Sequence, residues 1–479
     1  MSHDSGDNSR PESDPDQQGD VHGQAPNGNE DGDDLGSMSP PPVGPVTIPS
    51  EFVTFVDGLP APFVQAFEAD APGGVAWTPV VISSTDAAFT PTGQPVALFA
   101  AIDTPQPSPL LLSGNVVGLI SDGTAPLTVA DSATPTQYIA TGTGGMTLFA
   151  TAANGSFVAE GGTNTVVLGT KNMGAWTIDM LGGTNQVWAT GGNDTVETAA
   201  GSTNFVAFGA GNDLALSGGN DLFFGGAGND TINASGAQVS AVGGSGGMTF
   251  IDANTVPGGQ NALIFGGSGV LNVQGGVGSV TVVAGAGGGA VFGGAAGNNV
   301  LVGGSGPVTL VGGGGGDLLV GGSTGGAALV AGSGNETLIA GSGGNNQIWG
   351  GTGNDIIVMT GGNNTVVGGS GGSEIVWSGS GANVIDAGAA NLNVIAGLGG
   401  NDTIQAGSGT DIFTFTNGQA GGTTVIDNFN AASDHFVLNG YGTAAASITS
   451  SGGSTLITLA DKTQIQLIGV SNLPSSAIG

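Results

Sequence analysis

Carboxylates recur at a fixed place behind glycine-rich turns in this chain. Three segments match the nine-residue pattern G-G-x-G-x-D-x-U-x, in which U is a large apolar residue: Gly225–Asn233, Gly312–Val320 and Gly350–Val358. Incomplete copies lie at residues 182–185, 209–213, 331–336 and 406–411. Calcium takes about six to eight oxygen ligands and mixes carboxylates with backbone carbonyls. A glycine-rich turn that ends in Asp offers both kinds of oxygen, so the pattern predicts binding of calcium (Ca2+).

Each nonapeptide divides into a turn and a short strand. The first six residues are turn-like because glycine adopts backbone angles that a side chain forbids, and the last three alternate as a strand does. The apolar U position is expected to point inward, at Ile232, Leu319, Leu338, Ile357 and Ile404. The repetition runs from about residue 161 to 414 and predicts a stack of short strands.

These repeats resemble the RTX, or hemolysin-type calcium-binding repeat, family over about half of the chain. The resemblance implies an all-β fold, a right-handed parallel β-roll or β-helix solenoid. It also implies that two nonapeptides make one turn of a flattened coil. Positions about 18 residues apart would then stack on one edge, and positions 9 apart would lie on opposite edges.

Under this rule the sixth positions form two columns. One edge is mainly acidic and carries Asp317, Glu336, Asp355, Glu374, Asn393 and Asp411. The opposite edge is mainly amide and carries Asn346, Asn364, Asn383 and Asp402. Stacked carboxylates repel one another without a cation, whereas Asn both donates and accepts hydrogen bonds. We therefore expect calcium chiefly on the acidic edge, with side-chain hydrogen bonds holding the Asn edge.

An earlier cluster is expected to form a second group of calcium sites. The full set of expected metal ligands is Asp194, Asp213, Asp221, Asp230, Asp317, Glu336, Asp355, Glu374, Asp402 and Asp411. Between the two groups, residues 253–316 contain no Asp, Glu, Lys or Arg, although the Gly-Gly frame continues. Leu271, Val280 and Val308 stand where Asp belongs, so this part is expected to coil without calcium. The other possibility is a wholly structural solenoid whose acids are solvated turn residues.

Four regions are expected along the chain. Residues 1–45 are acidic and rich in Pro and Gly, which predicts a disordered tail. Residues 46–160 are a β-rich N-terminal region, either a separate domain or the irregular first part of the solenoid. Residues 161–414 are the RTX-like solenoid, and residues 415–479 are a C-terminal cap of alternating strands.

The C-terminal region resembles the cap and secretion region of RTX proteins exported by type I secretion systems. The N-terminal residues contain no apolar signal segment, so we expect an export address at the C-terminus. The expected partners are calcium ions and the type I secretion machinery. The expected location is extracellular, including the cell surface.

Charge and composition narrow the possible partners. The 479 residues carry a formal net charge of −33, with only Arg10, Lys171 and Lys462 as fixed positive charges. Binding to nucleic acid or to anionic lipid needs basic side chains, so neither is expected. No apolar run is long enough to span a bilayer. The chain has no Cys, which excludes disulfides and thiolate metal sites.

Catalytic motifs are weak in this sequence. H-E-x-x-H is absent, and His435 is the only His beyond the tail. Gly243–Gly247 satisfies G-x-S-x-G without the strand-to-helix context of a nucleophile elbow. We expect a secreted calcium-binding protein with a structural or interaction role at the cell surface or in the extracellular matrix. The alternative is a secreted hydrolase or polysaccharide-modifying enzyme with its active site in residues 46–160.

Overall fold

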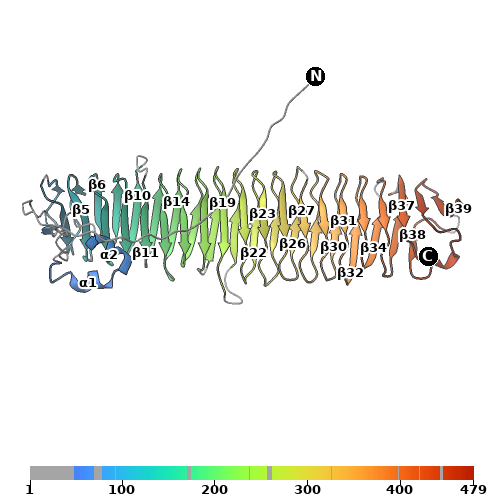
Figure 1. The fold of residues 1–479 in the computed structure, drawn as a ribbon, viewed down its shortest axis with the longest axis horizontal. Coiled ribbons are helices and arrows are strands. Elements are labelled where there is room, and N and C mark those ends of the chain that lie inside the picture. The colour runs from blue at the N-terminus through green and yellow to red at the C-terminus, as the bar shows by residue number, and fades with distance from the viewer. Residues whose placement is uncertain are drawn as a thin grey trace, which may run out of the picture. The chain divides into compact units, whose positions relative to one another are not determined.

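Short strands separated by glycine-rich turns form nearly all of the regular structure. A computed structural model describes residues 48–69, 78–91, 93–169, 174–236, 238–255, 261–324, 326–396, 399–419, 421–442 and 446–479. The expected tail at residues 1–45 and Lys171 lie outside the described residues. The strands follow one another along a single stack, with α1 and α2 near its N-terminal end and β39 near the other (Figure 1).

Alternate strands belong to two sheets. In the first, sheet A, neighbouring strands pair in this order: β1 (Thr78–Ile82), β3 (Val96–Ala100), β5 (Val116–Ser121), β7 (Gln137–Thr141), β9 (Gly155–Ala159), β11 (Trp176–Met180), β13 (Thr195–Thr198), β15 (Leu214–Ser217), β17 (Asp230–Ala234), β19 (Met248–Asp252), β21 (Leu271–Gln274), β23 (Gly289–Phe292), β25 (Val308–Val311), β27 (Ala328–Val330), β29 (Gln347–Trp349), β31 (Thr365–Val367), β33 (Val384–Asp386), β35 (Thr403–Gln405), β37 (Thr423–Asp427), β41 (Gln464–Leu467), β40 (Ser454–Leu459) and β39 (Ala446–Ser451).

The second sheet, sheet B, contains the intervening strands. They also pair in chain order: β2 (Ala88–Phe89), β4 (Leu110–Leu112), β6 (Leu127–Asp131), β8 (Met146–Ala150), β10 (Thr163–Leu168), β12 (Thr184–Ala189), β14 (Thr203–Phe208), β16 (Asn220–Phe224), β18 (Gln238–Val242), β20 (Ala262–Phe265), β22 (Val280–Val283), β24 (Val300–Val302), β26 (Leu318–Val320), β28 (Thr337–Ile339), β30 (Ile356–Val358), β32 (Ser373–Trp377), β34 (Asn391–Ala396), β36 (Ile412–Thr416) and β38 (His435–Asn439).

Pairing is parallel from β1 to β38, and each coil adds one strand to each sheet. Leu318 pairs with Thr337, and Thr337 with Ile356. A one-residue alternation sends every second side chain into the space between the sheets. The apolar U residues are fully buried there, as Ile232 and Leu319 illustrate. The expected all-β parallel solenoid is confirmed.

The stack runs through residue 160 without a break. β7 pairs with β9 and β9 with β11, while β8 pairs with β10. Residues 78–160 thus continue into the same solenoid, which is one of the two possibilities that the sequence left open.

Two short helices, which the sequence did not predict, precede the stack. α1 (Val53–Gly58) and α2 (Ala61–Ala69) bury Phe55, Phe63 and Phe67. These rings join a cluster with Phe99 and Tyr138 from the outer face of sheet A. The helices therefore cover an apolar part of that face. In the described part of the chain, no helix is long and apolar enough to cross a membrane.

Strands β20 to β25 form the charge-free part of the stack. Leu271, Val280 and Val308 are each buried to within 3% of full burial and replace Asp at the inward position before or at the start of a strand. An apolar side chain needs no partner there, so these coils close by backbone pairing, hydrophobic packing and the buried amide of Asn299, which accepts the Val280 N–H, without any carboxylate.

The C-terminal end changes from parallel to antiparallel pairing. β41 pairs parallel with β37, and β40 then pairs antiparallel with both β41 and β39. A short 3-10 helix, η2 (Ser475–Ala477), follows near β38. This arrangement covers the edge of β37, which would otherwise expose unpaired backbone groups.

Candidate metal centre

Four predicted ligands lie in one column of sheet B. The residues that directly follow these four ligands pair from strand to strand, in the order Leu318, Thr337, Ile356 and Ile375. Asp317, Glu336, Asp355 and Glu374 consequently stand in successive coils, and each is at most 1% exposed. They point inward at the corner where a turn enters a strand.

The register shifts by one residue after Glu374, so one expected position was wrong. Glu374 pairs with Leu392, whose N–H donates to Asp411 Oδ1 at 3.0 Å. Leu392, and not Asn393, occupies the column, because β32 and β34 are related by 18 residues at this point rather than 19.

One further acid extends this column. The Asp411 N–H donates to Asp434 Oδ1 at 3.2 Å. Asp434 lies 23 residues after Asp411 and beyond the recognisable repeats. The repeat period alone therefore did not predict this residue.

A repeated pair of hydrogen bonds holds the Asp side chains. The Glu336 N–H, one coil earlier, donates to Asp355 Oδ1 at 2.9 Å, and the Gly351 N–H of the same turn donates to Oδ2 at 3.1 Å. The same two contacts occur at Asp230, Asp317, Asp411 and Asp434. Each of these carboxylates therefore ties its own turn to the preceding coil.

Glu336 and Glu374 differ from these Asp residues because several of their carboxylate oxygens accept no hydrogen bond. Both Glu336 carboxylate oxygens and Glu374 Oε2 are buried and accept no hydrogen bond. Burial, with Asp355 beside it, raises the pKa of Glu336 to about 8. Burial also raises the pKa of Glu374 to about 7. An unpaired buried carboxylate is costly unless it is protonated or meets a cation.

A second acidic column lies in sheet A. Register aligns Asp194, Asp213 and Asp230, and the Asp194 N–H donates to Asp213 Oδ1 at 2.7 Å. Oδ2 of Asp194 and Oδ2 of Asp213 are buried without a partner. Burial raises the pKa of Asp213 to about 7 and that of Asp194 to about 6.

Asp221 does not join that cluster, because it lies in sheet B. It pairs with Asn204 at the end of a ladder of buried amides. Asn164 Nδ2 donates to Asn185 Oδ1 at 2.8 Å, and Asn185 Nδ2 donates to Asn204 Oδ1 at 2.6 Å. Asn204 Nδ2 donates to Asp221, which also accepts the hydroxyls of Thr198 and Ser217.

A second amide ladder follows the same plan in sheet A. Asn346 donates to Asn364, Asn364 to Asn383 and Asn383 to Asp402, over 2.9, 3.2 and 2.9 Å. This confirms that side-chain hydrogen bonds hold the Asn edge. Both ladders end on Asp because a carboxylate accepts but does not donate. Asp402 and Asp221 are thus already surrounded by donors.

The turns bring a backbone carbonyl of one coil into close contact with a glycine of the next coil. A Cβ on Gly353 would lie 1.2 Å from the Gly334 carbonyl oxygen, and one on Gly211 would lie 1.2 Å from that of Gly192. Only glycine allows this approach. The turns that precede the acidic columns therefore present carbonyl oxygens as well as carboxylates.

The donor set fits calcium. Within the described ranges, no three Asp, Glu or His side chains gather closely enough to hold a metal by themselves. A cation here would need backbone oxygens too, and calcium accepts that mixture. Buried carboxylate oxygens without a hydrogen-bond partner occur at Asp194 and Asp213 in sheet A, and at Asp131, Glu336 and Glu374 in sheet B.

Fold and site together define a parallel β-solenoid whose glycine turns enclose columns of buried carboxylates. The family model for the RTX calcium-binding nonapeptide repeat matches residues 181–215, 206–237, 293–324, 330–366, 368–391 and 393–419. The chain therefore carries several RTX calcium-binding nonapeptide repeats, arranged on a parallel β-roll. A search of curated proteins finds no match.

Proposed function

We propose that this protein is exported and that calcium outside the cell completes and stabilises its solenoid. The supporting observation is the set of buried carboxylate oxygens without partners at Asp194, Asp213, Glu336 and Glu374. These four side chains are the proposed principal ligands. Asp230, Asp317, Asp355 and Asp411 complete the two acidic columns. Asp221 and Asp402 close amide ladders and contribute less.

Calcium would act on the ionised side chains. The family's sites bind calcium, and metal binding competes with protons for carboxylates. Where calcium is scarce, the acidic columns oppose folding because charge is buried beside charge. Extracellular modules bind calcium with dissociation constants of about 10⁻⁴–10⁻³ M. A chain of this kind would therefore stay loosely folded before export and become ordered afterwards.

Residues 415–479 are proposed to act as the cap and to carry the type I secretion address. The antiparallel β39–β40–β41 unit at the end of sheet A supports the cap role. The resemblance to the terminal region of exported RTX proteins supports the address.

The proposed role outside the cell is structural or interactive, at the surface or in the matrix. A continuous stack of strands suits such a role because each coil contacts only its neighbours and the array extends without a separate core. The two helices on sheet A bury aromatic rings in packing contacts, which accounts for part of residues 46–160 without catalysis.

The test uses the full chain in a cell that carries a type I exporter. We expect the protein in the medium and, after purification with EDTA, a gain of β-sheet circular dichroism on addition of calcium to about 10 mM, above the expected site affinities. Retention inside the cell would refute the export address. An unchanged spectrum would refute calcium-controlled folding. Turnover of esters or polysaccharides by the purified chain would support the enzyme alternative instead.

A further inference from the structure

The outer face of sheet B carries an uninterrupted line of apolar side chains. Register connects one outward residue per strand, from Phe149 in β8 through Phe224 and Trp377 to Ile395 in β34. Every member of this column, here named the apolar stripe, is Val, Ile, Ala, Phe or Trp. No outward position of these strands bears a charge.

The apolar stripe is open to solvent in this single chain. Trp377 is 51% exposed, Phe149 47% and Phe265 41%. Where sheet A has an apolar outer face, near β3 to β9, the helices α1 and α2 cover it. Among the described residues, nothing comparable covers sheet B.

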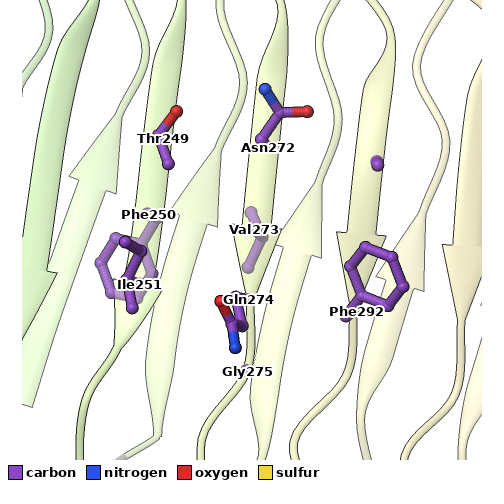
Figure 2. Close-up of a pocket in the computed structure, with 9 residues that line it drawn as sticks. Thr249, Phe250, Ile251, Asn272, Val273, Gln274, Gly275 and Phe292 are labelled. Atoms are coloured by element: carbon purple, nitrogen blue, oxygen red, sulfur yellow. The ribbon is translucent and has the colours of Figure 1, made fainter.

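The outer face of sheet A is different in character. Asp179 pairs with Glu197 there, and Asp386 lies further along the same register column. Where an aromatic ring is exposed on this face, polar side chains border it. Figure 2 shows Phe292 beside Gln274 and Asn272 at a shallow cavity of about 580 Å³. From β15 to β31 the outer face of sheet A also has no charged side chain, but Asn233 and Gln274 interrupt its apolar column. Only sheet B thus offers an apolar column that runs from β8 to β34 without a polar residue.

The size of the stripe's face matches a protein interface. Strands lie about 4.8 Å apart, so the run from β8 to β34 is roughly 60 Å long. Strands of three to six residues present a width of about 10–20 Å at about 3.3 Å per residue. The product is about 600–1,200 Å², compared with about 800 Å² per partner in a standard interface.

The charge of the chain restricts which partner fits. Residues 1–45 do not match this uncharged face, because ten of them are Asp or Glu. The outer face of sheet B carries no charged side chain, so a basic partner could form no ion pair with it. A second copy presents the same flat, uncharged surface, and the outer faces of two sheets pack at about 10 Å when both are apolar. Contact through sheet B also keeps the acidic outer face of sheet A directed away from the other copy.

We propose that two copies of this chain pair through the outer faces of sheet B, with the apolar stripe at the centre of the contact. The interface is isologous, as in most symmetric dimers. It goes beyond the proposed function, because the side chains that form it are not those of the acidic columns.

The test exploits the absence of Cys from the chain. Thr337→Cys places one thiol on the outer face of sheet B, and Thr309→Cys places one on the outer face of sheet A; both threonines are half-buried. In a concentration series in calcium, analytical ultracentrifugation is expected to show a dimer. Maleimide should label Thr337→Cys at least about tenfold more slowly in the dimer than in the dilute monomer, whereas labelling of Thr309→Cys should not change.

A matched pair of charge insertions provides the second measurement. Trp377→Lys puts like charges into the contact of two copies, while Trp349→Lys puts the same residue on the outer face of sheet A. Circular dichroism establishes that each variant is folded. We expect only Trp377→Lys to lose the dimer. A monomer at every concentration, or protection at Thr309→Cys instead of Thr337→Cys, would overturn the proposal. Loss of calcium binding with the dimer intact would refute the proposed function alone.

Discussion

Asp355 and Asn364 occupy equivalent positions on opposite edges of the same coils, which allows a matched comparison. Asp355 accepts the N–H groups of Glu336 and Gly351 at 2.9 and 3.1 Å. Asn364 accepts the N–H and the Nδ2 of Asn346 at 3.2 and 2.9 Å. Changing either residue to Ala therefore removes the acceptor of two N–H hydrogen bonds.

The two substitutions should cost similar stability without calcium and differ only in its presence. Each unpaired buried donor costs about 1–3 kcal/mol, so each variant should lose about 2–6 kcal/mol in EDTA. A site with a dissociation constant of about 10⁻⁴ M gains about 2.7 kcal/mol at about 10 mM calcium. Asp355→Ala should lose this calcium-linked gain, because it removes a carboxylate from the acidic column. Asn364→Ala should keep it.

Urea unfolding followed by the fluorescence of the five Trp residues measures this difference. Trp377 lies in β32, which pairs with β30 directly after Asp355. The quantity of interest is the unfolding free energy in calcium minus that in EDTA, for the wild type and both variants. Equal gains in the two variants, or a greater loss in Asn364→Ala, would refute the assignment of calcium to the acidic edge.

Three further predictions follow from the geometry. Without calcium, the raised pKa values of Glu336 (about 8) and Glu374 (about 7) mean that the folded chain holds more protons than the unfolded chain above pH about 4.5. Stability in EDTA should therefore fall as pH rises from 5 to 8, as thermal unfolding would show, and Glu336→Gln should flatten this slope; a rise would contradict it. Calcium should raise the melting temperature more at pH 8 than at pH 5.5, because protons compete for the same oxygens; an equal rise would count against carboxylate ligation. Gly353→Ala should lower the melting temperature because its Cβ would overlap the Gly334 carbonyl, whereas Gly371→Ala, with open space around it, should not; similar effects would refute the close approach of the turns.

The sequence predicts the solenoid well because its period is encoded twice, in the glycine turns and in the apolar U residues. Spacings of 19 residues correctly align Asp317, Glu336 and Asp355. The ladder of Asn346, Asn364 and Asn383 is also predictable, because Asn stacks by hydrogen bonding to itself.

The remaining differences arise where the coil length varies. β32 and β34 are related by 18 residues instead of 19, so Leu392 stands in the column where Asn393 was expected. No residue type at that point indicates the shorter coil. Asp221 lies 8 residues after Asp213 and 9 before Asp230, a half-coil spacing that places it on the opposite sheet. Consistent use of that spacing would have separated it from the sheet A column.

The helices α1 and α2 escape prediction for another reason. They are short, and their pattern of Phe residues matches a strand as well as a helix. Tertiary packing against Phe99 and Tyr138 stabilises them, and that contact involves residues far away in the sequence.

Hydrogen exchange of the full chain, with calcium and with EDTA, tests the central account most directly. Backbone amides in residues 194–230 and 317–411 should become protected in calcium, because the acidic columns lie there. Those in residues 262–302, which contain no charged side chain, should change little. Protection confined to the charge-free coils, or no change in either group, would contradict the account.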